Sequence, residues 1–177
     1  MKRLLVSALS ALTIGTGFPA IAQAQQAPAA QARVSPETVE AVRQFLTAEG
    51  LTVGDLNQEG AFVALPVSEP GLTWGVLFFP CQIDNCLDVR FSAAFTNEGV
   101  TPDMVNIWNT DRRFLSAHYL RTETGAGGAV VNYDVLMLQP GGVERLGAPL
   151  DIWRRGVAAF GLHVGYFERE AEAPPAQ

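Results

Sequence analysis

Apolar residues recur along this chain with two spacings, one typical of helices and one typical of strands. Spacings of three and four residues predict three helices, one at Pro36–Glu49 and two that begin at Pro102 and Pro149. Alternating apolar and polar residues, separated by Gly, Asn, Pro and Glu turns, predict six strands: Thr52–Leu56, Ala61–Val67, Thr73–Pro80, Cys86–Phe95, Ser116–Thr122 and Ala129–Leu138. The order is helix, meander, helix, hairpin, helix. We therefore expect an α+β fold in which three helices pack on an antiparallel sheet.

The predicted helices have recognisable start and stop residues. Ser35 precedes Pro36 and Thr101 precedes Pro102, and each pair combines a side-chain cap with a proline that suits the first helical turn. Gly50 follows the first helix and suits the left-handed conformation that often closes a helix. The residues expected to face the core are Val39, Val42 and Leu46 in the first helix, Met104, Ile107 and Trp108 in the second, and Trp153, Val157, Phe160, Val164 and Phe167 in the last.

Two cysteines indicate the register of the central hairpin. If Cys81 faces Cys86 across an antiparallel pair, a four-residue loop joins the strands. The same register places an almost wholly apolar set on one face, pairing Phe78 with Val89, Val76 with Phe91 and Trp74 with Ala93. A shift of one residue would break up that face and separate the two sulfurs. We therefore expect this register.

The other face of the same hairpin is half apolar and half polar. Leu77 and Phe79 share it with Asp88 and Arg90. Adjacent apolar side chains on a solvent-facing surface often mark an interface. We therefore predict that Leu77 and Phe79 contribute to partner binding.

The N-terminal 24 residues have the layout of a cleaved secretory signal. A short basic head precedes an apolar run from Leu4 to Ile14 that is too short for a permanent membrane span, and small residues up to Ala24 suit cleavage. We expect a flexible leader at 25–34, a folded domain at 35–167 and a disordered tail at 168–177. The mature protein is then periplasmic, or else extracellular, with no segment inserted in the membrane.

Cysteine use in an exported protein favours a structural disulfide. Cys81 and Cys86 are spaced C-x4-C, which is neither the C-x-x-C of a dithiol oxidoreductase nor enough ligands for zinc. We expect a Cys81–Cys86 bond. Because it closes so short a loop, it pins the turn more than it stabilises the fold.

The charge balance excludes several kinds of partner. The chain has 12 Lys and Arg against 18 Asp and Glu, a formal net charge of −6, and Lys2 is its only lysine. An acidic chain binds nucleic acid or anionic membranes poorly. Without a lysine in the domain, Schiff-base chemistry and a phosphate-loop lysine are excluded as well.

The second half of the chain resembles a known family. Cys86–Phe167 combines a long strand ending in Ala-Ala-Phe, a helix carrying Trp108 and Asn109, a glycine turn and a tryptophan-bearing last helix. Its most specific motif is NxWNxxxRF, at residues 106–114. This arrangement resembles the YbjN family, whose members are described as candidate bacterial sensory-transduction regulators and whose fold is similar to that of type III secretion chaperones. The signal segment and the cysteine pair resemble an exported branch of that family.

The motif has two interpretations. In the first, Trp108 and Phe114 anchor the second helix to the sheet, while Asn109 and Arg113 bond the backbone at the helix end. In the second, Asn109, Arg112 and Arg113 present a patch that binds a peptide or a carboxylate.

The sequence offers little support for an enzyme. It contains neither the G-x-S-x-G nor the H-E-x-x-H motif, and no dinucleotide or phosphate loop. His118 and His163 are expected to be structural. We therefore predict no catalytic residue, no cofactor and no metal site. A hydrolase that uses dispersed carboxylates, such as Asp84, Asp88, Glu123 and Asp134, is the least favoured alternative.

Together these features predict a non-enzymatic, exported interaction or regulatory module of the bacterial cell envelope. It would bind a protein or peptide in a chaperone-like way, and a homodimer is compatible with it. The main alternative is a carrier that holds a small apolar molecule between sheet and helices, near Trp74, Trp108 and Trp153.

Overall fold

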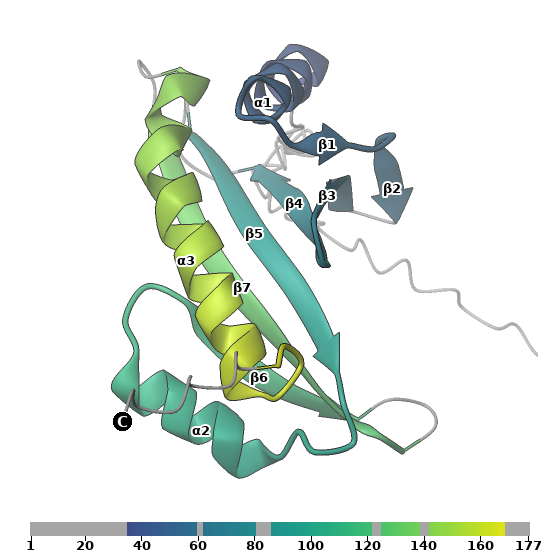
Figure 1. Cartoon of the computed structure of the whole chain (residues 1–177). Coiled ribbons are helices and arrows are strands. Elements are labelled where there is room, and N and C mark those ends of the chain that lie inside the picture. The colour runs from purple at the N-terminus through teal and green to yellow at the C-terminus, as the bar shows by residue number, and fades with distance from the viewer. Residues whose placement is uncertain (1–34, 60–61, 81–85, 122–124, 139–141, 169–177) are drawn as a thin grey trace, which may run out of the picture. The chain divides into compact units, whose positions relative to one another are not determined.

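Three helices and seven strands make up the described part of the chain (Figure 1). The computed structural model describes residues 35–59, 62–80, 86–121, 125–138 and 142–168, which fall in one compact unit, Ala32–Gln177. The helices are α1 (Pro36–Ala48), α2 (Pro102–Asp111) and α3 (Gly147–His163), and a short 3-10 helix, η1 (Val143–Leu146), leads into α3. The strands are β1 (Thr52–Val53), β2 (Asn57–Glu59), β3 (Phe62–Glu69), β4 (Leu72–Pro80), β5 (Cys86–Thr96), β6 (Ser116–Arg121) and β7 (Gly127–Leu138).

All the strands join one antiparallel sheet. Its order is β1-β3-β4-β5-β7-β6, and β2 pairs with β3 beside β1. After β5 the chain runs through α2 to the edge strand β6, and β7 then returns between β5 and β6. The predicted α+β class, with three helices on an antiparallel sheet, is confirmed.

The hairpin register is the predicted one. Phe78 pairs with Val89 and Val76 pairs with Phe91. All four side chains are fully buried, so this face of the hairpin is core. The predicted Cys81–Cys86 bond lies outside the described residues, as do the predicted signal segment and leader.

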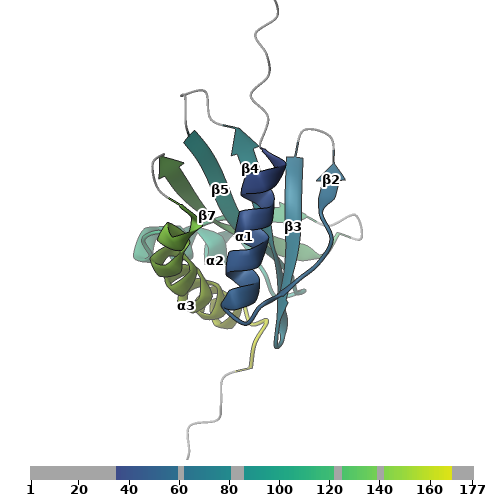
Figure 2. The ribbon, with the colours of Figure 1, turned by 90° about the horizontal axis from the view of Figure 1, so that it is seen from above.

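The described helices all pack on the same face of the sheet. Figure 1 shows α3 crossing β5 and β7, and Figure 2 shows α1 and α3 on one side of the strands. Trp153 of α3 lies against Trp74 and Phe91, with ring centroids 5.5 and 5.9 Å away. The inward residues of α1 join the same cluster: Val39, Val42 and Leu46. The opposite face of the sheet is left without a helix in the described part of the chain.

The predicted caps of α1 and α2 are confirmed. The Ser35 hydroxyl accepts a hydrogen bond from the Thr38 amide at 3.2 Å, and the Thr101 hydroxyl accepts one from the Met104 amide at 3.3 Å. Gly50 has a φ of 80°, the left-handed conformation expected after α1. These local signals are enough to set where both helices begin.

Three predicted details are wrong. Ile107 is 53% exposed, because α2 packs through Val105 and Trp108 instead. The last helix begins at Gly147, not at Pro149, and it ends at His163, so Val164 and Phe167 reach the core from beyond it. The strand predicted at Thr52–Leu56 is too long, since β1 ends at Val53, and a separate strand, β2, begins at Asn57, beyond the predicted bounds.

Candidate functional site

The face of the sheet that no described helix covers carries apolar side chains around a charged centre. Leu77 and Phe79 of β4 lie on this face, as predicted, since their neighbours Val76 and Phe78 point into the core. Both are half-buried rather than exposed. On β7, Leu136 is 60% exposed and lies opposite Asp88 of β5. We call Leu77, Phe79, Asp88, Arg90, Asp134 and Leu136 the open face.

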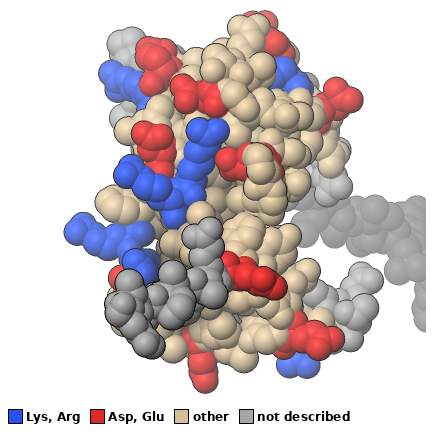
Figure 3. Space-filling model, viewed as in Figure 1, with Lys and Arg blue, Asp and Glu red and all other residues tan. Residues whose placement is uncertain are grey.

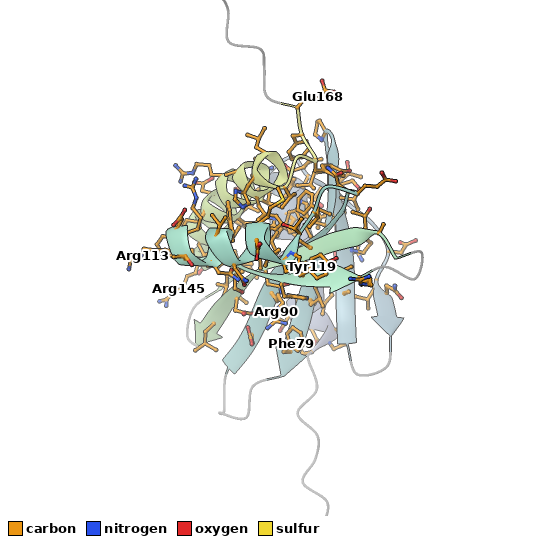
Figure 4. The ribbon with its side chains drawn as sticks, turned by 90° about the horizontal axis from the view of Figure 1, so that it is seen from below. Phe79, Arg90, Arg113, Tyr119, Arg145 and Glu168 are labelled. Carbon is orange, nitrogen blue, oxygen red and sulfur yellow. The ribbon has the colours of Figure 1, made fainter. Side chains whose placement is uncertain are left out.

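An ion pair crosses the open face. Arg90 donates two hydrogen bonds to Asp134, from Nε to Oδ1 at 2.6 Å and from Nη2 to Oδ2 at 3.3 Å. The hydrogen bonds from Arg90 to Asp134 raise the pKa of the guanidinium, against the opposing effect of burial. The same guanidinium lies over the Phe79 ring, 5.1 Å from its centroid (Figure 4). Arg90 therefore links β4, β5 and β7 across this face.

Asp88 is the unsatisfied group of the open face. Its Oδ1 is buried, and none of the described residues donates a hydrogen bond to it. Burial raises the pKa of Asp88, and the nearby Asp134 carboxylate raises it further, whereas Arg90 lowers it. The face thus holds two carboxylates and one guanidinium, with one carboxylate oxygen lacking a donor. A partner that supplied a donor would remove this penalty.

A second region of interest lies where α2 turns into β6. Asn109 donates from Nδ2 to the Ala117 carbonyl and accepts at Oδ1 from the Ala117 amide, both at 2.8 Å. The Trp108 indole donates to the Leu115 carbonyl at 3.2 Å, in a buried position. These three bonds fix the short connection between the helix and the strand.

Phe114 occupies a strained conformation inside that connection. Its φ is 69°, and the Leu115 amide bonds the Arg113 carbonyl at 2.8 Å across it. This is a γ-turn with positive φ at its centre, the rarer of the two forms. A non-glycine residue held there costs about 1–3 kcal/mol, and such strain clusters at functional sites. The Phe114 side chain is 65% exposed, so the expected packing of Phe114 against the sheet is wrong.

The same connection and α3 line an open pocket of about 200 Å³ that contains three arginines. Its basic members are Arg112 and Arg113 from the connection and Arg155 from α3. The other lining residues are apolar: Trp108, Phe114, Leu115, Ile152, Gly156 and Ala159. Figure 3 shows basic side chains gathered on the side where α3 lies in Figure 1. We call this site the arginine pocket.

Two of these arginines lie against aromatic rings. Arg112 is over the Trp108 ring at 5.4 Å, and Arg113 is over the Phe114 ring at 5.8 Å. Arg113 projects outward from the end of α2 (Figure 4). Among the described residues, no carboxylate forms a salt bridge with Arg112, Arg113 or Arg155. The stacking holds two guanidinium groups in place without neutralising them.

The structure divides the predicted site residues between these two places. Leu77 and Phe79 lie on the open face, whereas Arg112 and Arg113 line the arginine pocket. Asn109 lies beside that pocket, with its amide occupied by Ala117 as the first interpretation of the motif expected.

Sequence reasoning missed several members of both sites. Arg155 and Ile152 enter the pocket from α3, some 40 residues along the chain, so no local pattern joins them to the motif. Leu136 had a usable signal in the sequence pattern. It lies on the partly exposed face of β7 and alternates with residues that face the core.

Each histidine lies within hydrogen-bond distance of a described polar group. His163 lies 2.8 Å from the Met104 carbonyl oxygen, and His118 lies 3.5 Å from the Asn132 amide nitrogen. Within the described residues, no three His, Cys, Asp or Glu side chains are grouped as metal ligands. Of the carboxylates considered, Asp88 and Asp134 lie together on the open face, and Asp84 and Glu123 lie outside the described residues.

The tryptophans expected to surround an apolar ligand are packed against protein. Trp74 and Trp153 are in direct ring contact, and Trp108 packs edge-on against Phe160 with centroids 4.9 Å apart. All three are buried.

In the part of the chain that the structure describes, no helix has the length and apolar character needed to cross a membrane.

Comparison with known proteins finds similarity in structure but not in sequence. No protein family model matches the chain. No curated protein matches it either. Among solved structures, YbjN from E. coli, whose proposed role is in transcription regulation, is 15% identical with a TM-score of 0.53, covering 72% of this chain and 91% of YbjN. An uncharacterised protein from Methanothermobacter thermautotrophicus is 12% identical with a TM-score of 0.50, covering 73% of this chain and 97% of that protein. The chain therefore has a YbjN-like α+β fold.

Proposed function

We propose that this chain is a non-enzymatic interaction module of the bacterial cell envelope, which binds a protein partner on the open face. The N-terminal signal would export it to the periplasm, where Cys81 and Cys86 would form their disulfide. The observation that carries the proposal is the sheet itself, which is covered by helices on one face only within the described residues. On its other face, Leu77, Phe79 and Leu136 surround the open face's charged centre.

The charges of this face indicate the chemistry of the partner. Apolar side chains at Leu77 and Leu136 favour an apolar contact, which would be worth about 25 cal/mol per Å² buried. The Asp88 oxygen without a donor favours a partner that places one N–H group, best a guanidinium or an ammonium, beside it. We therefore expect a protein or peptide surface that is apolar with one basic residue.

A regulatory role would act through such a protein contact. YbjN, a structural neighbour, has a proposed role in transcription regulation. With a net charge of −6, this chain is poorly suited to touch nucleic acid itself. The carrier alternative has less support, since direct contact between Trp74 and Trp153 fills the space where the ligand was expected.

Three variants test the proposal: Leu77→Thr with Phe79→Thr, Leu136→Thr alone, and Asp88→Asn. Each should leave the oxidised protein folded by circular dichroism, and each should reduce self-association in light scattering or capture of one recurrent partner from periplasmic extract. Leu56→Thr is the matched control, since Leu56 is also exposed but lies outside the open face.

Two results would count against this function. Unfolding of the Leu77/Phe79 variant would mean that these side chains act as core. Association that survives in all three variants would mean that the open face is not the docking surface.

A further inference from the structure

The arginine pocket has the composition of a site for an anion that carries an apolar group. Its three guanidinium groups have no salt-bridge partner among the described carboxylates, although the chain has more acidic than basic residues. The remaining lining is apolar and includes the exposed Phe114 ring and Ile152 of α3. A bare inorganic anion would satisfy the arginines and leave this lining unmatched.

The pocket is open to solvent, and the space between its walls is about 200 Å³. Sites that enclose a drug-sized ligand usually measure about 300–1,000 Å³. An open site of this kind can contact one terminal residue of a chain while the rest of that chain extends into solvent.

Arginine is also the residue suited to a carboxylate. Its planar fork can donate two parallel hydrogen bonds to both oxygens. Arg112 and Arg113 are held against the Trp108 and Phe114 rings, so less side-chain freedom is lost on binding.

We infer that the arginine pocket binds the C-terminal residue of a polypeptide that ends in an apolar side chain. The terminal carboxylate lies among Arg112, Arg113 and Arg155, and the terminal side chain packs against Phe114 and Ile152. Capture of a C-terminal carboxylate is one of the recurrent modes of peptide recognition. This site is distinct from the open face, so the two proposals stand or fall separately.

The strained turn gives the Phe114 ring a role in this site. Positive φ at Phe114 and the bond between Leu115 and Arg113 hold the ring outward, on the rim of the pocket. The bonds from Trp108 and Asn109 keep the turn in this conformation. Strain that is maintained by several hydrogen bonds is expected where an exposed side chain is used.

The test uses fluorescence anisotropy with the purified protein and two labelled hexapeptides. Both end in leucine, one with a free carboxylate and the other with a C-terminal amide. The free acid should bind at least tenfold more tightly than the amide, and its affinity should fall as salt is raised. Arg112→Gln with Arg113→Gln should weaken binding of the acid by tenfold or more. Arg121→Gln, an exposed arginine outside the pocket, should leave it unchanged.

Further arms separate the peptide from other anions with the same chemistry. Phe114→Ala should weaken binding of the free acid several-fold, and a peptide ending in glycine should bind less tightly than one ending in leucine. Inorganic phosphate and dodecanoate, added as competitors, should displace the peptide only weakly. Equal binding of acid and amide would overturn the inference. So would tight binding of dodecanoate, retention of binding in the double arginine variant, or no binding at millimolar peptide.

Discussion

The side chain of Asn109 pairs with the backbone of Ala117 as a neighbouring strand would. Its amide nitrogen donates to the Ala117 carbonyl and its oxygen accepts from the Ala117 amide, both at 2.8 Å. This pair of hydrogen bonds joins the last turn of α2 to the first residues of β6. The NxWNxxxRF motif therefore has a structural part, Trp108 and Asn109, that positions the exposed Arg113 and Phe114.

Replacing Asn109 should loosen this junction. Asn109→Ala leaves the Ala117 amide and carbonyl without their partners, so we expect the free energy of unfolding to fall by about 1–3 kcal/mol. Urea denaturation at neutral pH measures the change. Asn106→Ala, one turn earlier on the exposed side of α2, is the control and should change the stability by less than about 0.5 kcal/mol. Equal losses for the two variants would mean that the Ala117 bonds contribute nothing.

Phe114 offers a direct measurement of backbone strain. At a φ of 69°, glycine is less strained than alanine, so Phe114→Gly should be more stable than Phe114→Ala by about 1 kcal/mol. The ring is absent from both variants, so its contacts cancel. At the exposed helical position Ile107 the order should reverse, with glycine less stable than alanine by about 1 kcal/mol. Alanine more stable than glycine at both positions would show that Phe114 is not strained.

The hairpin and the helix caps could be predicted from sequence because one local pattern decided each. A single register placed Phe78 and Val76 opposite apolar partners, and Ser35 with Pro36 left one place for α1 to begin. The exposure of Phe114 could not be predicted in this way. Its turn conformation is imposed by bonds from Trp108 and Asn109 to residues further along the chain.

The buried side of α2 could not be predicted from the local sequence pattern either. Both Ile107 and Val105 fit a helical stripe in the sequence, and contact with α3 and β6 decides that Val105 is buried. Only part of the arginine pocket was predicted, because the rest of its lining depends on tertiary packing. Arg112 and Arg113 share a motif, but Arg155 and Ile152 reach them only through the packing of α3.

Asp88 should make the stability of the protein depend on pH. Burial raises its pKa in the folded protein above the ordinary value of 3.8, so the folded state holds this proton more tightly than the unfolded state does. Its contribution to stability is therefore complete below pH 3.8 and is lost as pH rises through the folded pKa. Asp88→Asn cannot ionise, so its stability relative to the original protein should increase across that window and then level off. The increase should be modest, because the carboxyl is only partly buried.

Urea denaturation of both proteins between about pH 3 and pH 7 measures this difference, and the other carboxylates cancel in the comparison. If the stability of Asp88→Asn relative to the original protein instead fell with rising pH, ionisation of Asp88 would stabilise the folded state. The same variant also serves in the partner test, where the expected effect is the opposite, a loss of binding.

Gly127 at the start of β7 should not tolerate a side chain. A Cβ built there overlaps the carbonyl oxygen of Val100, and that oxygen belongs to backbone that cannot rotate away. We expect Gly127→Ala to lower the free energy of unfolding by about 1–3 kcal/mol. The matched control is Gly147→Ala at the first residue of α3, where a Cβ meets no heavy atom within 4 Å. There the stability should stay unchanged or rise by up to about 1 kcal/mol, since alanine is the better helix former. Thermal unfolding of the two variants side by side tests the close approach of β7 to Val100, and equal melting temperatures would contradict it.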